Sequence, residues 1–351
     1  MVENVGILGY GVYIPKYRIQ KEEYTKAWGY FAAAGIKEKA VPRFDEDATT
    51  MAVEASRNAI KYAEIDPKNL NAIYSATTSS PYSEKLLSST LASAVGASEN
   101  VALADFRASS KAGATALLSC YDFLKSGRGE HGLVSASDCP IGYPADDVEH
   151  AFGAASASYV LGKGDIIADL KDAHQVGFEM WGGRFRRKGD KFASALGITK
   201  FNTIEYNQVI TSAVRQLLKK NDLRPEDIDY VVFQQPDARY PFRVSKPLGF
   251  ETEQVTLGIL ASSVGDVGTC SPLLGLAAVL DVAEEENRIL VASYGSGTGS
   301  DAFILTMRKS GGLKGKVPSV KEYLKSKIYI DYIKYLRWKR MLQSSFSTGE
   351  K

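Results

Sequence analysis

A pattern that occurs twice, at a nearly constant offset, constrains this chain more than any single motif. Residues 65–74 (IDPKNLNAIY) match residues 223–232 (LRPEDIDYVV) at an offset of 158, and each copy follows a helical pattern and leads into an apolar strand. Residues 116–136 resemble residues 273–293 at an offset of 157, and both segments have the pattern of a helix, a turn and a strand. Two matches in the same order at nearly the same spacing predict an internal duplication.

Each half of the chain is expected to alternate short strands with helices. The strands are apolar throughout, which is typical of strands buried on both faces, and the alternation predicts a layered α/β fold. Either Asp45 or Asp47 is expected to cap a helix that begins near Ala48. The expected strands are Ala72–Ser75, Leu133–Ala136, Val231–Phe233, Ile289–Ser293 and a closing strand Ser300–Met307. The expected regions are an N-terminal half over 1–165, a C-terminal half over 166–310 and a tail over 311–351.

The tail has a composition of its own. Between residues 313 and 341, nine Lys or Arg side chains and two acidic ones are interleaved with four tyrosines and Trp338. This pattern suits nucleic-acid or membrane contact, or a C-terminal helix whose aromatic stripe docks on the body or on a partner subunit. We favour docking, because the whole chain has a net charge of only +2 and nothing else in it indicates nucleic acid.

The N-terminus shows no targeting pattern, since no basic region precedes an apolar stretch there. The longest apolar run, Leu273–Leu280, is far shorter than a membrane span. The chain has three cysteines and no C-x-x-C pair, which argues against a disulfide framework or a zinc cluster. We therefore expect a cytoplasmic protein with no metal and no contact with membranes. Three cysteines and three histidines also leave few residues for a mechanism that needs a thiolate or an imidazole.

Several long segments resemble the archaeal-type 3-hydroxy-3-methylglutaryl-CoA (HMG-CoA) synthases, and the similarity spans essentially the whole chain. The segments that carry it are Gly6–Arg18, Asp45–Ala55, Lys111–Thr115, Ser293–Phe303, Ser319–Tyr323 and Tyr329–Tyr332. The resemblance implies the duplicated thiolase fold, a five-layer αβαβα arrangement of the α/β class. It also implies a homodimer or a higher oligomer.

The resemblance further implies a catalytic site with a Cys nucleophile, a Glu general acid/base and a His that helps to bind the second substrate. This chain keeps the three motifs but has another residue at each key position. Ser110 stands at the Cys position in ASSKAG, and Thr78 stands at the Glu position in TTSSPY. Gln234 stands at the His position in FQQPD, and Asp266 replaces an Asn of the family in GDVGTC.

These substitutions remove specific chemical capacities. A serine hydroxyl needs an adjacent base before it can attack a thioester, whereas a thiol supplies some thiolate near neutral pH. Gln234 cannot accept a proton, and Thr78 cannot act as a carboxylate. Together the three changes leave hydrogen-bonding side chains of moderate size where a reactive triad is expected.

The remaining cysteines and histidines offer few replacements. His150 aligns near the family's substrate pocket and is the candidate base for Ser110, although we favour a supporting or surface role for it. His131 follows a Gly-Arg-Gly turn and His174 lies in a polar stretch, so we expect both to be exposed, His174 in a solvated loop. Cys139 follows an expected strand, and we interpret it as a core residue.

Residues that could contact CoA are better retained than the residues of the triad. Arg239 and Arg243 match basic positions of the family and are candidates to hold a CoA phosphate, with a solvated or dimer-contact role as the alternative. Ser296 matches a serine that lines the family's pocket. The turn Gly295–Gly299 is not followed by a helical pattern, so a dinucleotide site is not expected. We expect no covalently bound cofactor, and CoA or acyl-CoA as the ligand.

The resemblance leaves three interpretations open. We favour a non-catalytic subunit that assembles with an active thiolase-type subunit and a small OB-fold/zinc-ribbon protein. The combination of Phe233–Gln235 with Ser263–Asp266 is similar to the synthase-like subunit of bacterial phloroglucinol acetyltransferase complexes. The second interpretation is an active acyltransferase of altered mechanism, with Ser110 or a residue of a partner as the nucleophile. The third is an ordinary HMG-CoA synthase whose triad lies elsewhere in the sequence.

Overall fold

The computed structural model describes residues 5–179, 183–195, 199–310 and 315–342. Nine strands form one hydrogen-bonded sheet, which bends so that its two ends lie in separate layers. In spatial order the strands are β5 (Ala102–Arg107), β4 (Ala72–Thr77), β6 (His131–Asp138), β7 (Ala155–Gly162), β1 (Gly6–Tyr13), β8 (Ala168–Gly177), β13 (Gly299–Met307), β12 (Arg288–Ala292) and β11 (Tyr230–Phe233). The antiparallel pair of β1 and β8 joins the strands of the two halves.

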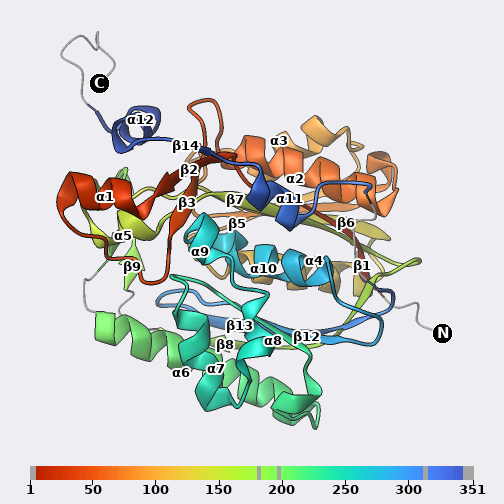
Figure 1. The fold of residues 1–351 in the computed structure, drawn as a ribbon. Helices are drawn as coiled ribbons and strands as arrows, with labels where there is room; N and C mark the ends of the chain where they lie inside the picture. The colour runs from red at the N-terminus through yellow and green to blue at the C-terminus, as the bar shows by residue number, and fades with distance from the viewer. Residues whose placement is uncertain (1–4, 180–182, 196–198, 311–314, 343–351) are drawn as a thin grey trace.

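Helices and strands alternate in five layers (Figure 1). The outer helices of the first half are α2 (Ala48–Ala63) and α3 (Leu87–Val95). The central layer contains α4 (Ala112–Lys125) and α10 (Ser271–Leu280). The outer helices of the second half are α6 (Thr199–Lys220), α7 (Tyr240–Leu248) and α8 (Thr252–Thr256). Every residue of α10 is buried, because this apolar helix lies between two layers of strands.

The predicted duplication is visible in the elements themselves. In the first copy, α2 is followed by the 3-10 turn Pro67–Asn69 and by β4; in the second copy, α6 is followed by the 3-10 turn Pro225–Asp227 and by β11. Proline opens each turn, where its missing N–H leaves no hydrogen bond unmade. The second matched pair likewise forms α4 with β6 and α10 with β12. The layered α/β architecture and the strands expected from the sequence are therefore confirmed.

Asp47, and not Asp45, caps α2. The N–H of Thr50 donates to the Asp47 carboxylate at 2.8 Å, and the N–H of Asp47 donates to the Thr50 hydroxyl at 2.8 Å. This reciprocal cap satisfies two main-chain donors and stabilises the helix by about 1 kcal/mol. The carboxylate of Asp45 instead lies 3.5 Å from the guanidinium of Arg43.

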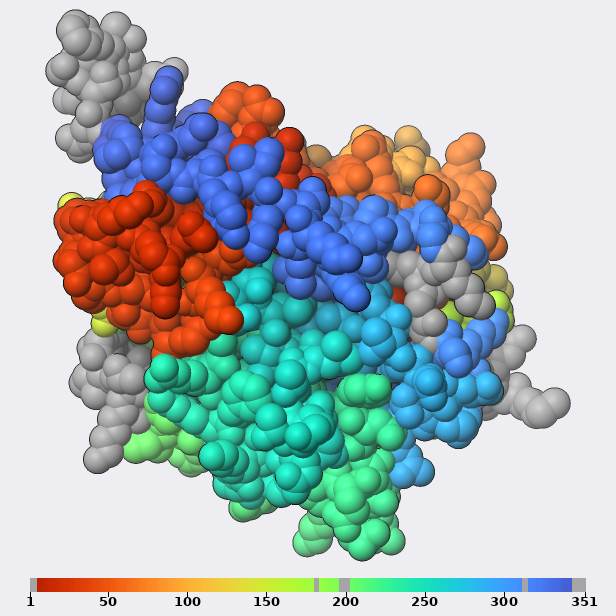
Figure 2. Space-filling model, viewed as in Figure 1, coloured from red at the N-terminus to blue at the C-terminus, as the bar shows by residue number. Residues whose placement is uncertain are grey.

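The end of the described chain docks on its beginning. Figure 2 shows the blue C-terminal segment lying against the red N-terminal segment. β14 (Ile328–Tyr329) pairs in parallel with β2 (Tyr17–Gln20), which also pairs with β3 (Glu38–Val41). The remaining elements here are α1 (Lys21–Trp28), α11 (Val320–Lys325) and α12 (Tyr332–Trp338).

The aromatic stripe of α12 faces the body, as expected. Its residues Tyr332, Tyr335 and Leu336 are buried in a cluster with Tyr24 and Ile19. The parts of the tail at 311–314 and 343–351 lie outside the described residues. None of the described helices is both long enough and apolar enough to cross a membrane.

Candidate functional site

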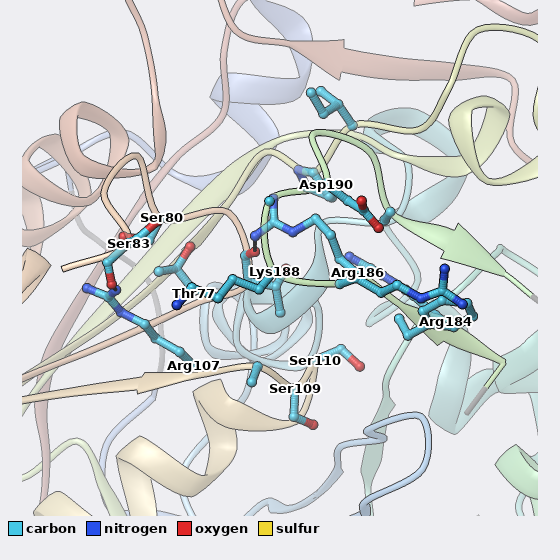
Figure 3. A pocket seen from close by; sticks show the side chains of 18 of the residues that line it. Thr77, Ser80, Ser83, Arg107, Ser109, Ser110, Arg184, Arg186, Lys188 and Asp190 are labelled. Atoms are coloured by element: carbon cyan, nitrogen blue, oxygen red, sulfur yellow. Dashed lines mark hydrogen bonds between the residues drawn. The ribbon is translucent and has the colours of Figure 1, made fainter. Parts of the chain in front are cut away.

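Two cavities meet at Ser110. The larger has a volume of about 660 Å³ and the smaller about 200 Å³, and both are lined by Ser110, Arg184 and Ser296. Thr78 lines the larger cavity and Gln234 lines the smaller one. The fold therefore brings together the three positions that the sequence assigns to the triad, although they lie in three separate segments. Figure 3 shows Ser109 and Ser110 on one side of the larger cavity, with Thr77 and Arg107 among the residues around it.

Ser110 lies in the turn between β5 and α4. Ala108 has a φ of 69°, a left-handed conformation that is unfavourable for a residue with a side chain, and it turns the chain sharply after β5. The Ser110 hydroxyl donates to the main-chain carbonyl of Tyr294 at 2.7 Å. Within the described part of the chain, neither a carboxylate nor an imidazole lies within hydrogen-bond distance of this hydroxyl. Its neighbours thus orient the Ser110 hydroxyl without activating it.

Thr78 is held by a carboxylate that the sequence analysis missed. Asp138, the last residue of β6, is buried and accepts hydrogen bonds from both the N–H and the hydroxyl of Thr78, at 2.8 and 3.0 Å. Its other donors are the hydroxyls of Thr77 and Ser79 and the N–H of Thr269. Five donors replace the water that a buried carboxylate loses, and they fix the loop that carries Thr78. An acidic residue at the end of an otherwise buried strand was the signal that could have indicated this role.

Gln234 follows β11 directly and is buried. Its side-chain N–H donates to the main-chain carbonyl of Gly268 at 2.7 Å, and its own main-chain carbonyl accepts from the Tyr206 hydroxyl at 2.6 Å. The side-chain oxygen Oε1 is buried and has no hydrogen-bond partner among the described residues. Gln234 therefore holds a buried acceptor without a partner beside the smaller cavity, which carries an unfavourable desolvation.

Asp266 forms an ion pair with Arg184 at the junction of the cavities. The Arg184 guanidinium lies 3.0 Å from the Asp266 carboxylate and 4.3 Å from the centroid of the Phe152 ring. Burial raises the pKa of Asp266, and the opposing charge of Arg184 partly offsets this effect. Arg184 belongs to the short strand β9 (Arg184–Phe185), which pairs with β10 (Ser194–Ala195), and its N–H donates to the Ser296 hydroxyl at 3.1 Å. No motif in the sequence pointed to Arg184.

His150 is not placed to serve Ser110 as a base. It lies in α5 (Asp147–Ala151), is fully buried and lines neither cavity. Its Nδ1 accepts from the N–H of Ala32 at 3.0 Å, and its ring stacks on Phe31 with 5.3 Å between the centroids. Burial lowers the pKa of His150 to about 4, so this imidazole is neutral near pH 7. The supporting role that we favoured agrees with this position.

The other histidines and Cys139 belong to the scaffold. His174 was expected in a solvated loop, and this expectation is wrong: it lies in β8, where it pairs with Ala302 of β13. Its segment is rich in polar residues, which favoured a loop, but these residues lie in a strand that pairs with β13. His131 begins β6 and is partly buried instead of exposed. Cys139 is partly buried against a hydrophobic cluster, in agreement with a core role.

The candidate CoA contacts lie beside the smaller cavity. Arg239 and Arg243 are exposed at the beginning of α7, and the Arg243 guanidinium lies 5.7 Å from the centroid of the Tyr240 ring. Tyr240 and Asp237 line the smaller cavity, and the two arginines lie close to them in the sequence. Ser296 lines both cavities, as the sequence predicts. Within the described ranges, no group of three or more His, Cys, Asp or Glu side chains is arranged to hold a metal ion.

Known proteins resemble this chain over its whole length. It is 38% identical to the hydroxymethylglutaryl-CoA synthase of Methanopyrus kandleri, over 97% of this chain and 99% of the relative. It is also 38% identical to the hydroxymethylglutaryl-CoA synthase of Methanocaldococcus jannaschii, over 96% and 99%. Residues 218–307 match the family model of the 3-oxoacyl-[acyl-carrier-protein (ACP)] synthase III C terminal.

Solved structures agree in fold. The structure of MvaS in complex with 3-hydroxy-3-methylglutaryl coenzyme A superimposes with a TM-score of 0.87 and 18% identity, over 96% of this chain and 92% of that chain. The 3-oxoacyl-[acyl-carrier-protein] synthase III of Aquifex aeolicus VF5 superimposes with a TM-score of 0.79 and 19% identity, over 86% and 99%. These matches confirm the expected α/β thiolase fold.

Proposed function

Because the chain belongs to the hydroxymethylglutaryl-CoA synthase family, we propose that it binds an acyl-CoA thioester where the two cavities meet at Ser110. The observation that carries this proposal is the convergence of Ser110, Thr78 and Gln234 on adjoining cavities. The solved structure of MvaS contains HMG-CoA, and another HMG-CoA synthase structure contains CoA, which supports CoA as the ligand here. CoA would bind as a substrate and not as a covalently attached cofactor.

Two features of this chain suit such a ligand. The exposed arginines Arg239 and Arg243 would hold a CoA phosphate beside the smaller cavity, because guanidinium groups bind phosphate oxygens through paired hydrogen bonds. Ser110 and Ser296 lie further in, where the two cavities join, and would contact the thioester. From the sequence we also propose that the protein acts in the cytoplasm.

The relatives favour an active enzyme. Similarity to hydroxymethylglutaryl-CoA synthases over 97% of the chain supports an acyltransferase or synthase of altered mechanism. In that mechanism Ser110, or a residue supplied by a partner, would attack the thioester. Ser110 would need a base that approaches its hydroxyl when the ligand is bound, because its present hydrogen bond is to the Tyr294 carbonyl.

The residues at the triad positions favour a second candidate, a non-catalytic subunit. Gln234 accepts no proton, and the hydroxyl of Thr78 is engaged by Asp138. Such a subunit would assemble with an active thiolase-type subunit and a small OB-fold/zinc-ribbon protein, as a homodimer or a higher oligomer. It would contribute scaffold and part of the thioester pocket.

One experiment separates these candidates. The purified protein is titrated with acetyl-CoA by calorimetry, and its intact mass is then measured after incubation with acetyl-CoA. Binding with an acetyl adduct that disappears in Ser110→Ala identifies Ser110 as the nucleophile. Binding without an adduct argues against Ser110 as the nucleophile and supports a subunit whose reactive residue, if any, belongs to a partner. The absence of any binding of CoA or acetyl-CoA contradicts the proposed function.

A further inference from the structure

One short helix near the C-terminus is tied to the walls of both cavities. No residue of α12 is among those that line either cavity, and the helix lies at the same side of the molecule as α5 and β9 (Figure 1). At its beginning, the Tyr332 hydroxyl donates to the Glu149 carboxylate of α5 at 3.0 Å. Just past its end, the main-chain carbonyl of Arg340 accepts from the Lys191 ammonium at 2.6 Å. The two ends of α12 are therefore fastened to two different parts of the site.

The tie at Lys191 holds a hairpin that covers the larger cavity. β9 and β10 pair only with each other and form a two-stranded sheet apart from the nine-stranded one. Residues 185–191 between them are exposed, although most of them also line the cavity. Figure 3 shows Arg186 and Lys188 of this hairpin across the cavity from Ser110. A segment with so little buried surface opens more readily than the sheets below it, so each tie to the body matters for its position.

The tie at Glu149 holds α5, which belongs to the wall of the smaller cavity. The buried Glu149 carboxylate also accepts from the N–H of Ala145 at 2.9 Å, and its main-chain carbonyl accepts from the buried ammonium of Lys39. That ammonium lies 5.0 Å from the centroid of the Tyr335 ring of α12. Without α12, a buried carboxylate would lose the Tyr332 hydroxyl and a buried ammonium would lose an aromatic face, so α5 would be held less firmly.

α12 can leave the body without disturbing the main sheet. It has seven residues and follows the two-residue strand β14, and neither element belongs to the nine-stranded sheet. Isolated helices shorter than about 12 residues are marginal in water, so α12 depends on docking through buried Tyr335 and Leu336. Arg340 ends the helix in the left-handed conformation, with a φ of 53°. This turn places the Arg340 carbonyl, so the contact with Lys191 is lost when α12 detaches.

We propose that the segment 328–340 is a strap whose docking regulates the thioester site. This inference rests on the proposed function and adds a mode of regulation to it. The docked strap fastens α5 and the hairpin, so less order remains to be created when an acyl-CoA binds. The released strap leaves both walls to be ordered by the ligand, and the affinity is then lower. Because coupling between two sites is reciprocal, a bound acyl-CoA also favours the docked strap.

The first test needs no variant. Hydrogen exchange of the full-length protein is followed by mass spectrometry with and without saturating acetyl-CoA. We expect acetyl-CoA to slow exchange in α12 about fivefold or more, although this helix lines neither cavity. The internal control is α11, whose residues Val320, Tyr323 and Leu324 pack on the main hydrophobic core, and its exchange should change by less than about twofold.

The second test removes both ties in the double variant Tyr332→Phe/Lys191→Met, which keeps side chains of similar size. We expect the slowing of α12 by acetyl-CoA to fall to within about twofold, and the affinity for acetyl-CoA by calorimetry to fall about fivefold or more, since both report the same coupling. The matched control Tyr230→Phe/Lys321→Met removes a hydroxyl from β11 and an ammonium from α11, and it should retain the slowing and the affinity.

Each other outcome overturns the inference. Equal slowing in α11 and α12 means that the ligand stabilises the whole protein and not the strap in particular. Binding of acetyl-CoA without slowing in α12 means that the strap and the site are independent, while the proposed function stands. Slowing that persists in the double variant means that the two ties do not carry the coupling. If the unmodified protein binds no acetyl-CoA, the proposed function fails and this inference with it.

Discussion

Asp138 holds Thr78 from two sides, because its carboxylate accepts one hydrogen bond from the Thr78 N–H at 2.8 Å and another from the Thr78 hydroxyl at 3.0 Å. The same buried carboxylate accepts three further donors. Asp138→Asn places an amide N–H₂ opposite a main-chain N–H in either orientation, because one carboxylate oxygen accepts from the N–H of Thr78 and the other from the N–H of Thr269. We expect a loss of about 2–4 kcal/mol in the free energy of unfolding, measured by urea denaturation. Asp190→Asn, at an exposed carboxylate, should change it by less than about 0.5 kcal/mol. Equal effects of the two variants would contradict the structural role of Asp138.

The ion pair of Arg184 and Asp266 should show strong coupling. Arg184→Met leaves the Asp266 carboxylate buried without its cation, and such a loss costs about 3–5 kcal/mol. In the double variant Arg184→Met/Asp266→Asn the uncompensated charge is gone, so we expect most of the stability to return. A double-mutant cycle by chemical denaturation measures the coupling, and additive effects of the two single substitutions would argue against the pair.

Lys39 should make stability depend on pH. It is buried between the rings of Tyr24 and Tyr335, at 4.6 and 5.0 Å from their centroids, and its ammonium donates to the main-chain carbonyl of Glu149. Burial lowers the pKa of Lys39 to about 7 from 10.5, against the opposing attraction of the Glu149 carboxylate. His150 and Lys339 also face this cluster.

Between these two pKa values the unfolded chain binds more protons at Lys39 than the folded chain does. Stability should therefore rise with pH from about 7 to about 10, with a slope of at most about 1.4 kcal/mol per pH unit from this group. Lys39→Met should abolish this rise, as followed by urea denaturation at several pH values. Persistence of the full slope in the variant would assign the pH dependence to other groups.

Tyr332 on α12 should stabilise the wall of the smaller cavity. Its hydroxyl contacts the two carboxylate oxygens of Glu149 in α5 at 3.0 and 3.1 Å, and α5 lines that cavity through Val148 and Ala151. Tyr332→Phe removes a donor from a buried carboxylate, so we expect a loss of about 1–3 kcal/mol and weaker binding of acetyl-CoA. Tyr329→Phe is the matched control: the Tyr329 side chain is exposed, and the Glu38 carboxylate that accepts from its hydroxyl keeps the ammonium of Lys327 as a partner, so we expect a cost of less than about 1 kcal/mol.

Restoring the substituted groups should restore the covalent step. Ser110→Cys alone supplies a thiol without a base, so we expect little acetyl adduct near pH 7. Ser110→Cys combined with Gln234→His places a thiol and an imidazole on the same cavity, and an acetyl-enzyme should accumulate with acetyl-CoA in intact-mass analysis. If neither variant acquires an acetyl group while both bind acetyl-CoA, the cavity does not present the thioester to residue 110.

The sequence was informative where structure follows from local pattern. The repeated Pro-containing segments predicted a duplication, and apolar runs such as Leu133–Ala136 predicted strands buried between helices. Ser110, Gln234 and Thr78 were found because each stands inside a recognisable motif. Asp138 and Arg184 were missed because their importance depends on segments brought together only by the fold. His174 was assigned to a loop because its segment is polar, and β13, the partner that holds this segment as a strand, lies some 130 residues further along the chain.

The docking of the C-terminal segment on β2 and α1 bears on how the chain acquires its structure during synthesis. β2 obtains its second neighbour only from β14, and the apolar side chains of Ile19 and Tyr24 are covered by α12. A nascent chain therefore leaves the ribosome with this N-terminal surface uncovered until the residues of α12 emerge. Premature termination before α12 would yield a product that keeps most of its layers but exposes an apolar N-terminal surface. We expect molecular chaperones to bind such a product.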